Sequence, residues 1–153
     1  MRKLLAGVIC VSLGGFALAH AQGSAVSVPA DAIIAARQAT FDLQQAALIS
    51  LKVAIDNKLP LGKAQRDAAR AIAAWGTALP GMFPPGTDSG HHTHAKPQIW
   101  SDRATFEKAA AALATAAGNM AKAAEAGDSA AFAADFRTTA GACKSCHEKF
   151  RAR

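Results

Sequence analysis

Apolar side chains recur at intervals of three, four and seven residues in four stretches of this chain, and this periodicity constrains its fold more than any other feature. The stretches cover approximately residues 30–58, 62–79, 101–127 and 128–153. Such spacings place side chains on one face of an α-helix, whereas a half-buried strand alternates with a period of two. Pro60, Pro80 and Gly127 separate the stretches, as expected for residues that end helices. We therefore predict an all-α protein.

The links between the predicted helices indicate how these helices are arranged. Only a few residues join the first helix to the second and the third to the fourth, which makes each pair antiparallel neighbours. Ser101 is a suitable N-cap for the third helix, and Asp128 is a suitable N-cap for the fourth. The sequence therefore predicts one domain, folded as an antiparallel up-down-up-down four-helix bundle.

Residues 1–21 have the pattern of an export signal. Arg2 and Lys3 precede an apolar run, and Ala19-His20-Ala21 has small side chains where signal peptidase requires them. The apolar run, about 15 residues long, is shorter than the roughly 20 residues that cross a bilayer comfortably. We predict cleavage after Ala21 and a mature domain over 22–153 without a membrane segment. A single-span anchor is the less favoured alternative.

The charge balance of the mature chain does not indicate nucleic-acid binding. Without Arg2 and Lys3 the chain keeps 15 basic and 11 acidic side chains, a net charge of about +4. No segment interleaves Lys or Arg with aromatic residues, which is the pattern that a nucleic-acid surface would show.

Two cysteines remain after the predicted cleavage, and both lie in Cys143-Lys144-Ser145-Cys146-His147. Residues three apart lie on one side of a helix, so both thiols can reach one edge of a porphyrin while His147 ligates its iron. A zinc site would require four ligands, and a thioredoxin-like redox motif would require a βαβ context. We therefore predict one haem c per chain, covalently bound through Cys143 and Cys146, with His147 as the metal ligand.

The second axial position of the iron determines what such a haem does. His147 lies about 20 residues into the last helix, roughly 30 Å from the preceding turn, whereas Met120 lies near that turn and some 20 Å from the iron. The start of the antiparallel first helix, around Arg37 to Phe41, lies at the level of the haem. Because this helix contains no Met and no His, we expect the apolar Phe41 to face the open side of the iron.

Three segments together resemble cytochrome c′, the class II cytochromes c. They are the C-terminal motif followed by Phe150-Arg151, the pair Arg37-Gln38, and Lys96-Pro97-Gln98-Ile99-Trp100-Ser101-Asp102. The resemblance covers essentially the whole mature chain. It implies a periplasmic protein of a Gram-negative bacterium, with a five-coordinate haem that binds NO and CO and takes part in electron transfer with an unidentified redox partner. It also implies a homodimer that packs through the first and second helices.

The resemblance assigns roles to further residues. It places Arg37 and Gln38 against the haem and its propionates, Arg151 at the border of the proximal pocket, and Phe41 over the distal face. In the six-coordinate c-556 branch the first helix supplies a methionine near this position, so Phe41 favours the c′ branch. The alternative is a six-coordinate, low-spin electron carrier with a loop His or Met as the sixth ligand.

The loop after Pro85-Gly86-Thr87 departs from the family pattern, because His91-His92-Thr93-His94 lengthens it. Residues of this loop often approach the propionates in the family, so Thr87 and His91 are candidate contacts. A solvated loop without a role, adventitious binding of Zn or Cu, and a histidine that reaches the iron are the other interpretations. We expect a binding or electron-transfer protein rather than an enzyme, because no carboxylates are paired for acid–base catalysis.

Overall fold

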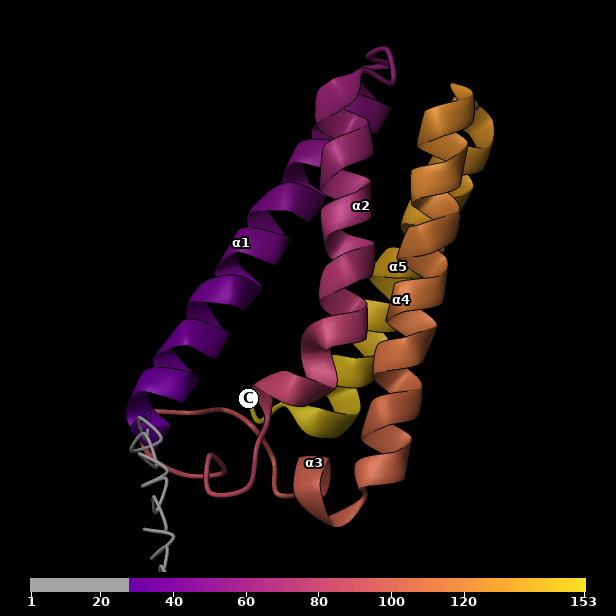
Figure 1. The fold of residues 1–153 in the computed structure, drawn as a ribbon. Coiled ribbons are helices and arrows are strands. Elements are labelled where there is room, and N and C mark those ends of the chain that lie inside the picture. The colour runs from indigo at the N-terminus through magenta and orange to yellow at the C-terminus, as the bar shows by residue number, and fades with distance from the viewer. Residues whose placement is uncertain (1–27) are drawn as a thin grey trace, which may run out of the picture.

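The computed structural model describes residues 28–153, so the predicted signal peptide over 1–21 lies outside the described residues. The helices follow in the order α1 (Ala30–Asp56), α2 (Lys63–Ala78), η1 (Leu79–Met82), α3 (Gln98–Ser101), α4 (Arg103–Ala126) and α5 (Ser129–Phe150). The four long helices α1, α2, α4 and α5 form an up-down-up-down bundle (Figure 1). The predicted fold is therefore confirmed. None of the helices within 28–153 has the length and apolar character that crossing a membrane requires.

The turn between α4 and α5 forms at the two residues that the sequence indicates. Gly127 ends α4 in the left-handed conformation, with φ +70° and ψ +15°, which glycine adopts without the penalty of a Cβ. The carboxylate of Asp128 then accepts hydrogen bonds from the backbone N–H groups of Ala130 and Ala131, at 3.1 and 2.9 Å. The turn between α4 and α5 is thus determined by the backbone conformation of Gly127 and the side-chain hydrogen bonds of Asp128.

The start of α4 differs from the prediction, because Ser101 is not its N-cap. Ser101 is the last residue of the one-turn helix α3, and Asp102, with φ −123° and ψ +54°, separates α3 from α4. Pro97 precedes α3 and has its φ already fixed near the helical value, which favours a separate turn at this point. The apolar periodicity did not reveal this interruption.

The interior of the bundle consists of two clusters of buried apolar side chains. The cluster towards the α4–α5 turn contains Leu51, Ile72, Phe132 and the fully buried Met120. The second cluster lies at the other end of the bundle and contains Phe83, Ile99, Phe106 and Phe150, among others. Met120 thus packs far from the end that holds the C-terminal turns of α5.

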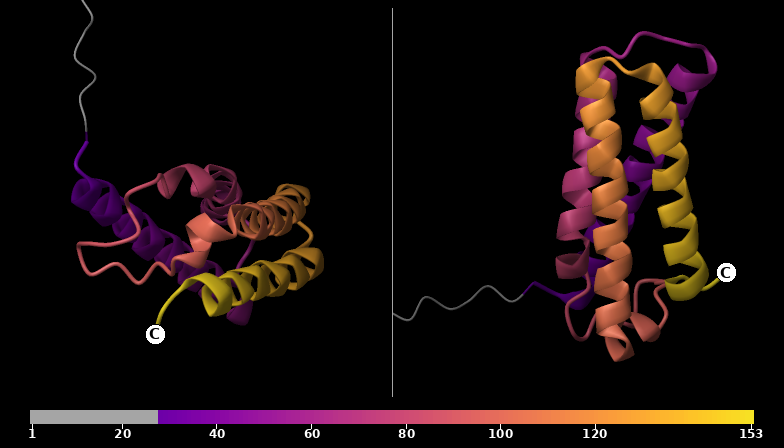
Figure 2. Two further views of the ribbon diagram at one scale, coloured as in Figure 1. Left: turned by 90° about the horizontal axis from the view of Figure 1, so that it is seen from below. Right: turned by 90° about the vertical axis from the view of Figure 1, so that its right-hand side faces the viewer.

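Helix α1 is the least tightly packed of the four. Helix α4 contacts α2 and α5 along its length, whereas α1 contacts its neighbours much less. The views agree that α1 lies near α2 at their common turn and diverges towards its own N-terminus (Figures 1 and 2). The loop between η1 and α3 runs across this wider end of the bundle.

Candidate functional site

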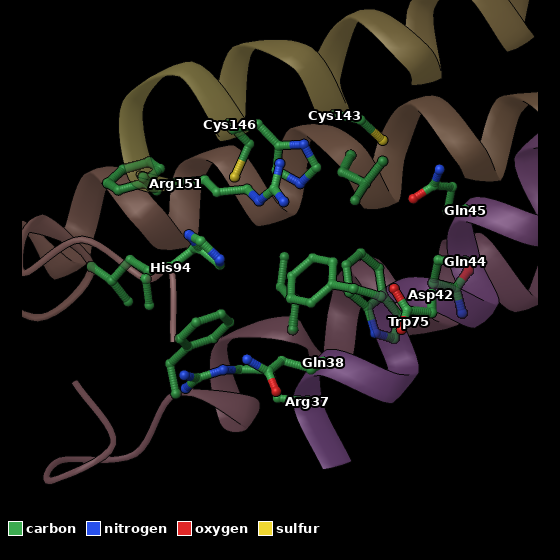
Figure 3. A pocket seen from close by; sticks show the side chains of 18 of the residues that line it. Arg37, Gln38, Asp42, Gln44, Gln45, Trp75, His94, Cys143, Cys146 and Arg151 are labelled. Carbon is green, nitrogen blue, oxygen red and sulfur yellow. The ribbon is translucent and has the colours of Figure 1, made fainter. Parts of the chain in front are cut away.

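A cavity of about 410 Å³ lies at the wide end of the bundle, between the first half of α1 and the last turns of α5 (Figure 3). Its volume falls within the range of roughly 300–1,000 Å³ that small-molecule and cofactor pockets occupy. The lining residues come from all four long helices and from the loop before α3. They are Arg37, Gln38, Phe41, Asp42, Gln44, Gln45, Leu48, Trp75, Leu79, Phe83, Thr93, His94, Ala95, Ile99, Phe106, Leu113, Cys143, Cys146, His147, Phe150 and Arg151.

Helix α5 brings both cysteines to the same edge of the cavity (Figure 3). Burial raises the pKa of Cys143, and burial together with the neighbouring Cys143 raises the pKa of Cys146 to about 11. Both thiols are therefore protonated at neutral pH. Redox-active and metal-binding cysteine pairs instead have lowered pKa values. The pair thus lacks the electrostatics of a disulfide-exchange motif.

His147 faces Phe41 across the cavity, with 6.1 Å between the two ring centroids. Burial, and to a lesser degree the charge of Arg151, lowers the pKa of His147 below its ordinary value. The imidazole is therefore neutral at pH 7, which is the form that ligates iron.

Aromatic side chains hold Phe41 in place on the wall opposite His147. Its ring packs edge-on against Trp75, with centroids 4.8 Å apart, and against Phe83, with centroids 6.4 Å apart. Among residues 28–153, no methionine lines the cavity, and His94 is the one histidine besides His147 that does.

Arg37 lies at the edge of the cavity, but its guanidinium group binds the loop. Nη1 donates to Thr87 Oγ1 at 3.1 Å and to the carbonyl of Met82 at 3.4 Å, while Nη2 donates to the carbonyl of Thr87 at 3.2 Å and to Thr93 Oγ1 at 3.0 Å. The guanidinium carbon lies 4.2 Å from the centroid of the Phe83 ring. Arg37 is 2% exposed, and this burial lowers its pKa. Arg37 therefore fastens the loop to α1.

The cavity brings together most of the residues that the sequence singled out. Those that line it are Arg37, Gln38, Phe41, Cys143, Cys146, His147 and Arg151. Thr87 and His91 are not among the lining residues: Thr87 is buried under Arg37, and His91 offers its carbonyl to Gln38 Nε2 at 3.4 Å. Over residues 28–153, no three His, Cys, Asp or Glu side chains are placed to hold a metal ion.

Other lining residues differ in whether a sequence signal could have found them. Gln44, Gln45 and Leu48 follow Phe41 at spacings of three, four and seven, so helical periodicity places them on the same face. Phe83 and His94 reach the cavity only because of the path of the loop. No local pattern predicts that path.

The chemistry of the walls fits a haem. Within the described residues, two buried side-chain polar atoms lack a hydrogen-bond partner, Gln44 Oε1 and Trp75 Nε1, and both residues line this cavity. Buried polar atoms nearly always have a hydrogen-bond partner, so these two unpaired atoms indicate a cavity wall that a bound group completes. The rest of the lining is largely apolar, as a porphyrin face requires, and the cysteine pair and His147 lie at one side.

A helical bundle with such a cavity, and with Cys-x-x-Cys-His on its wall, defines the class of four-helix c-type haem proteins. The family model described as Cytochrome C′ matches residues 32–151. The chain therefore belongs to the cytochrome c′ family. This finding confirms the resemblance seen in the sequence.

Individual relatives show the same similarity. Cytochrome c′ of Rubrivivax gelatinosus is 49% identical over 69 residues, which cover 45% of this chain and 54% of that protein. Cytochrome c′ of Pararhodospirillum photometricum is 39% identical over 102 residues, which cover 67% of this chain and 82% of that protein.

Solved structures share the fold. A cytochrome c′ with ligand-controlled dimer dissociation has a TM-score of 0.78 and 27% identity, covering 84% of this chain and 100% of that chain. A nitric oxide complex of a cytochrome c′ mutant from Alcaligenes xylosoxidans has a TM-score of 0.74 and 25% identity, covering 83% and 98%.

Proposed function

We propose that this protein carries one haem c, attached through Cys143 and Cys146 and ligated by His147, and that the opposite face of the iron is open to NO and CO. The observation that carries the proposal is the position of Phe41 across the cavity from His147, at 6.1 Å between ring centroids. A phenyl ring has no electron pair to donate to iron. The wall opposite His147 therefore offers a steric barrier instead of a sixth ligand.

The haem supplies, when bound, the iron that takes up a diatomic ligand or an electron. The residues around it position and shield this group. Two thioether bonds retain it even in an open cavity, and the neutral His147 coordinates from one side. Phe41 restricts access on the other side, because Trp75 and Phe83 hold its ring.

Further observations support NO binding and export. The nitric oxide complex of the Alcaligenes xylosoxidans protein supports NO as a ligand for this chain. The pattern of residues 1–21, with cleavage after Ala21, supports export to the periplasm. We include electron exchange with a redox partner in the proposed role, and no catalysis.

Visible spectra of the purified holoprotein test the coordination of the iron. We expect high-spin spectra in the ferric and ferrous states. Addition of CO or NO should change the ferrous spectrum to that of the ligand-bound haem. Low-spin spectra in both states without added ligand would show that a sixth protein ligand is present. The Met120→Leu variant serves as a control and should leave all spectra unchanged, because Met120 is buried in the other cluster.

The second candidate is a six-coordinate electron carrier, and the presence of His94 in the cavity wall favours it. In that case the wild-type spectrum is low-spin and the His94→Ala variant is high-spin. We prefer the open site because Phe41, not His94, faces the ring of His147.

The outer surface of α1 supports the proposal of a homodimer through α1 and α2. Leu43, Ile49 and Val53 are 70, 56 and 50% exposed, although they are large apolar side chains. They lie within about one third of the circumference of α1 and so form one strip. Burying this strip against a second copy would remove apolar area from water, which is the main driving force of association.

A further inference from the structure

Phe83, the residue that follows η1, contacts two residues of α1 that lie four positions apart. Its ring packs edge-on against Phe41, with 6.4 Å between centroids, and the guanidinium carbon of Arg37 lies 4.2 Å from the centroid of the same ring. A cation at this distance from an aromatic ring is attracted to it. Phe83 is 4% exposed, so one buried ring forms both contacts with α1.

Helices α3 and α4 hold Phe83 in place. Its ring packs edge-on against Trp100 and Phe106, with centroids 5.9 and 5.0 Å apart. Its carbonyl accepts a hydrogen bond from Arg103 Nη1 at 3.1 Å, and the neighbouring carbonyl of Pro84 accepts one from Trp100 Nε1 at 3.0 Å. Phe83 is thus a fixed support against which the first half of α1 packs.

The first half of α1 has few other contacts that would keep Phe41 over the cavity. Helix α1 contacts its neighbours much less than α4 does, and it diverges from α2 towards its own N-terminus (Figures 1 and 2). Between residues 30 and 40, the buried side chains of α1 are Ile34 and Arg37. Gln38 adds one exposed hydrogen bond, from its Nε2 to the carbonyl of His91 at 3.4 Å. Arg37 is therefore the main polar attachment of this half of α1 to the loop.

Both terminal nitrogens of Arg37 bind the loop. Together they donate four hydrogen bonds, to Thr87, Thr93 and the carbonyl of Met82, at 3.0–3.4 Å. Side chains four residues apart lie on one face of a helix, so Arg37 and Phe41 extend from the same face of α1. An outward movement of this part of α1 therefore displaces Phe41 and breaks the bonds of Arg37 together.

We propose that Arg37 is a positioning residue for gas entry, which holds Phe41 over the open face of the iron by fastening the first half of α1 to Phe83 and the loop. This inference rests on the proposed function, in which Phe41 restricts access to the iron. Two movements displace Phe41: rotation of its ring, and an outward movement of the first half of α1. The bonds of Arg37 oppose the second movement. This role differs from the contact with the propionates that the family resemblance implies for Arg37.

The association rate constant of CO with the ferrous holoprotein tests the proposal in a double-mutant cycle. Arg37→Lys keeps the charge but loses the forked set of donors, so it should bind CO about 2- to 12-fold faster than the wild type, the effect of a net loss of one hydrogen bond. In the Phe41→Ala background the same substitution should change the rate by less than about 1.5-fold, because no ring remains to be positioned.

Arg66→Lys is the matched control for Arg37→Lys. Arg66 Nη1 also donates to a loop carbonyl, that of Leu61, at 3.1 Å, but Arg66 does not line the cavity. This variant should bind CO at the wild-type rate. An acceleration equal to that of Arg37→Lys would show a general loosening of the bundle and would overturn the proposal.

Hydrogen exchange of the holoprotein, followed by mass spectrometry, gives a readout that does not depend on gas binding. Arg37→Lys should exchange faster than the wild type in peptides that cover residues 30–41 and 84–95, and at the wild-type rate in peptides from α4. Unaltered exchange over residues 30–41 would show that Arg37 does not hold α1 and would overturn the proposal. Thr93→Val removes one acceptor of Arg37 and repeats both tests if Arg37→Lys does not fold.

Equal acceleration by Arg37→Lys in the wild-type and Phe41→Ala backgrounds overturns the inference, because Arg37 then acts independently of Phe41. The Phe41→Ala variant also separates this failure from failure of the proposed function. If Phe41→Ala binds CO faster than the wild type and Arg37→Lys does not, only the role of Arg37 is refuted. If Phe41→Ala itself binds CO at the wild-type rate, the role of Phe41 and the role of Arg37 are both refuted.

Discussion

Removal of the Phe41 ring should accelerate the binding of CO to the ferrous protein. In the proposed site a ligand reaches the iron only when this ring moves away from its place opposite His147. In Phe41→Ala no ring fills the space opposite His147, so an incoming ligand meets no side-chain barrier there. The effect tests the central claim that Phe41, rather than the solvent-exposed edge of the cavity, controls access to the iron.

The expected magnitude follows from the contacts that the ring gives up when it moves. Phe41 packs edge-on against Trp75 at 4.8 Å and Phe83 at 6.4 Å between centroids. Each such aromatic pair contributes about 0.5–1.5 kcal/mol, so displacement costs about 1–3 kcal/mol. Since about 1.4 kcal/mol corresponds to a tenfold change in rate, Phe41→Ala should raise the association rate constant about 5- to 150-fold.

Flash photolysis or stopped-flow mixing with CO measures this rate constant directly. Phe41→Leu should give an intermediate value, because it keeps part of the volume without the aromatic contacts. Leu43→Ala is the matched control on the same helix, since Leu43 is 70% exposed and does not line the cavity. If Phe41→Ala and Leu43→Ala bind CO at the wild-type rate, the gating role of Phe41 is refuted.

Three further predictions concern the scaffold and its assembly. Arg37→Met should lower the free energy of unfolding in urea by roughly 3 kcal/mol, because the buried guanidinium of Arg37 holds the loop. Arg70 has a 55% exposed side chain, so Arg70→Met should lower it by less than about 1 kcal/mol. Equal losses in the two variants would contradict this prediction. Gly76→Ala should destabilise the bundle by about 1–3 kcal/mol, because a Cβ at position 76 would lie 2.9 Å from the backbone nitrogen of Ala114. A Cβ at position 118 would have no atom within 4 Å, so Gly118→Ala should be neutral or stabilising. A Gly76→Ala variant as stable as Gly118→Ala in the same assay would disprove the close contact of α2 and α4. Val53→Asp should shift the proposed dimer to monomer in sedimentation experiments, and an unchanged mass would argue against α1 as the interface.

The helix boundaries were accessible from the sequence because they depend on neighbouring residues. Gly127 and Asp128 form the α4–α5 turn through their own backbone and side chain, so their identity alone predicts it. The prediction that Ser101 is the N-cap of α4 was wrong because it, too, relied only on neighbouring residues. A one-turn helix followed by a long helix shows the same apolar spacing as one continuous helix, and the break at Asp102 leaves no mark in that spacing.

The sequence by itself determined the chemistry at one wall of the site. Cys143, Cys146 and His147 lie within a single helical turn and a half, so their relative placement follows from helix geometry. The same geometry, applied to an antiparallel bundle, placed Phe41 opposite them and Met120 at the far end.

Only the tertiary structure decided how the loop meets the bundle. The bonds from Arg37 to Thr87 and Thr93 join residues 50 and 56 positions apart, and no pattern of neighbouring side chains specifies such a pairing. The loop histidines show the consequence, since His94 lines the cavity and His91 does not, although the two are only three residues apart. The reason is physical. Local hydrogen bonding and periodicity set a helix, whereas the path of a loop depends on which distant side chains and carbonyl groups it meets when the whole chain has folded.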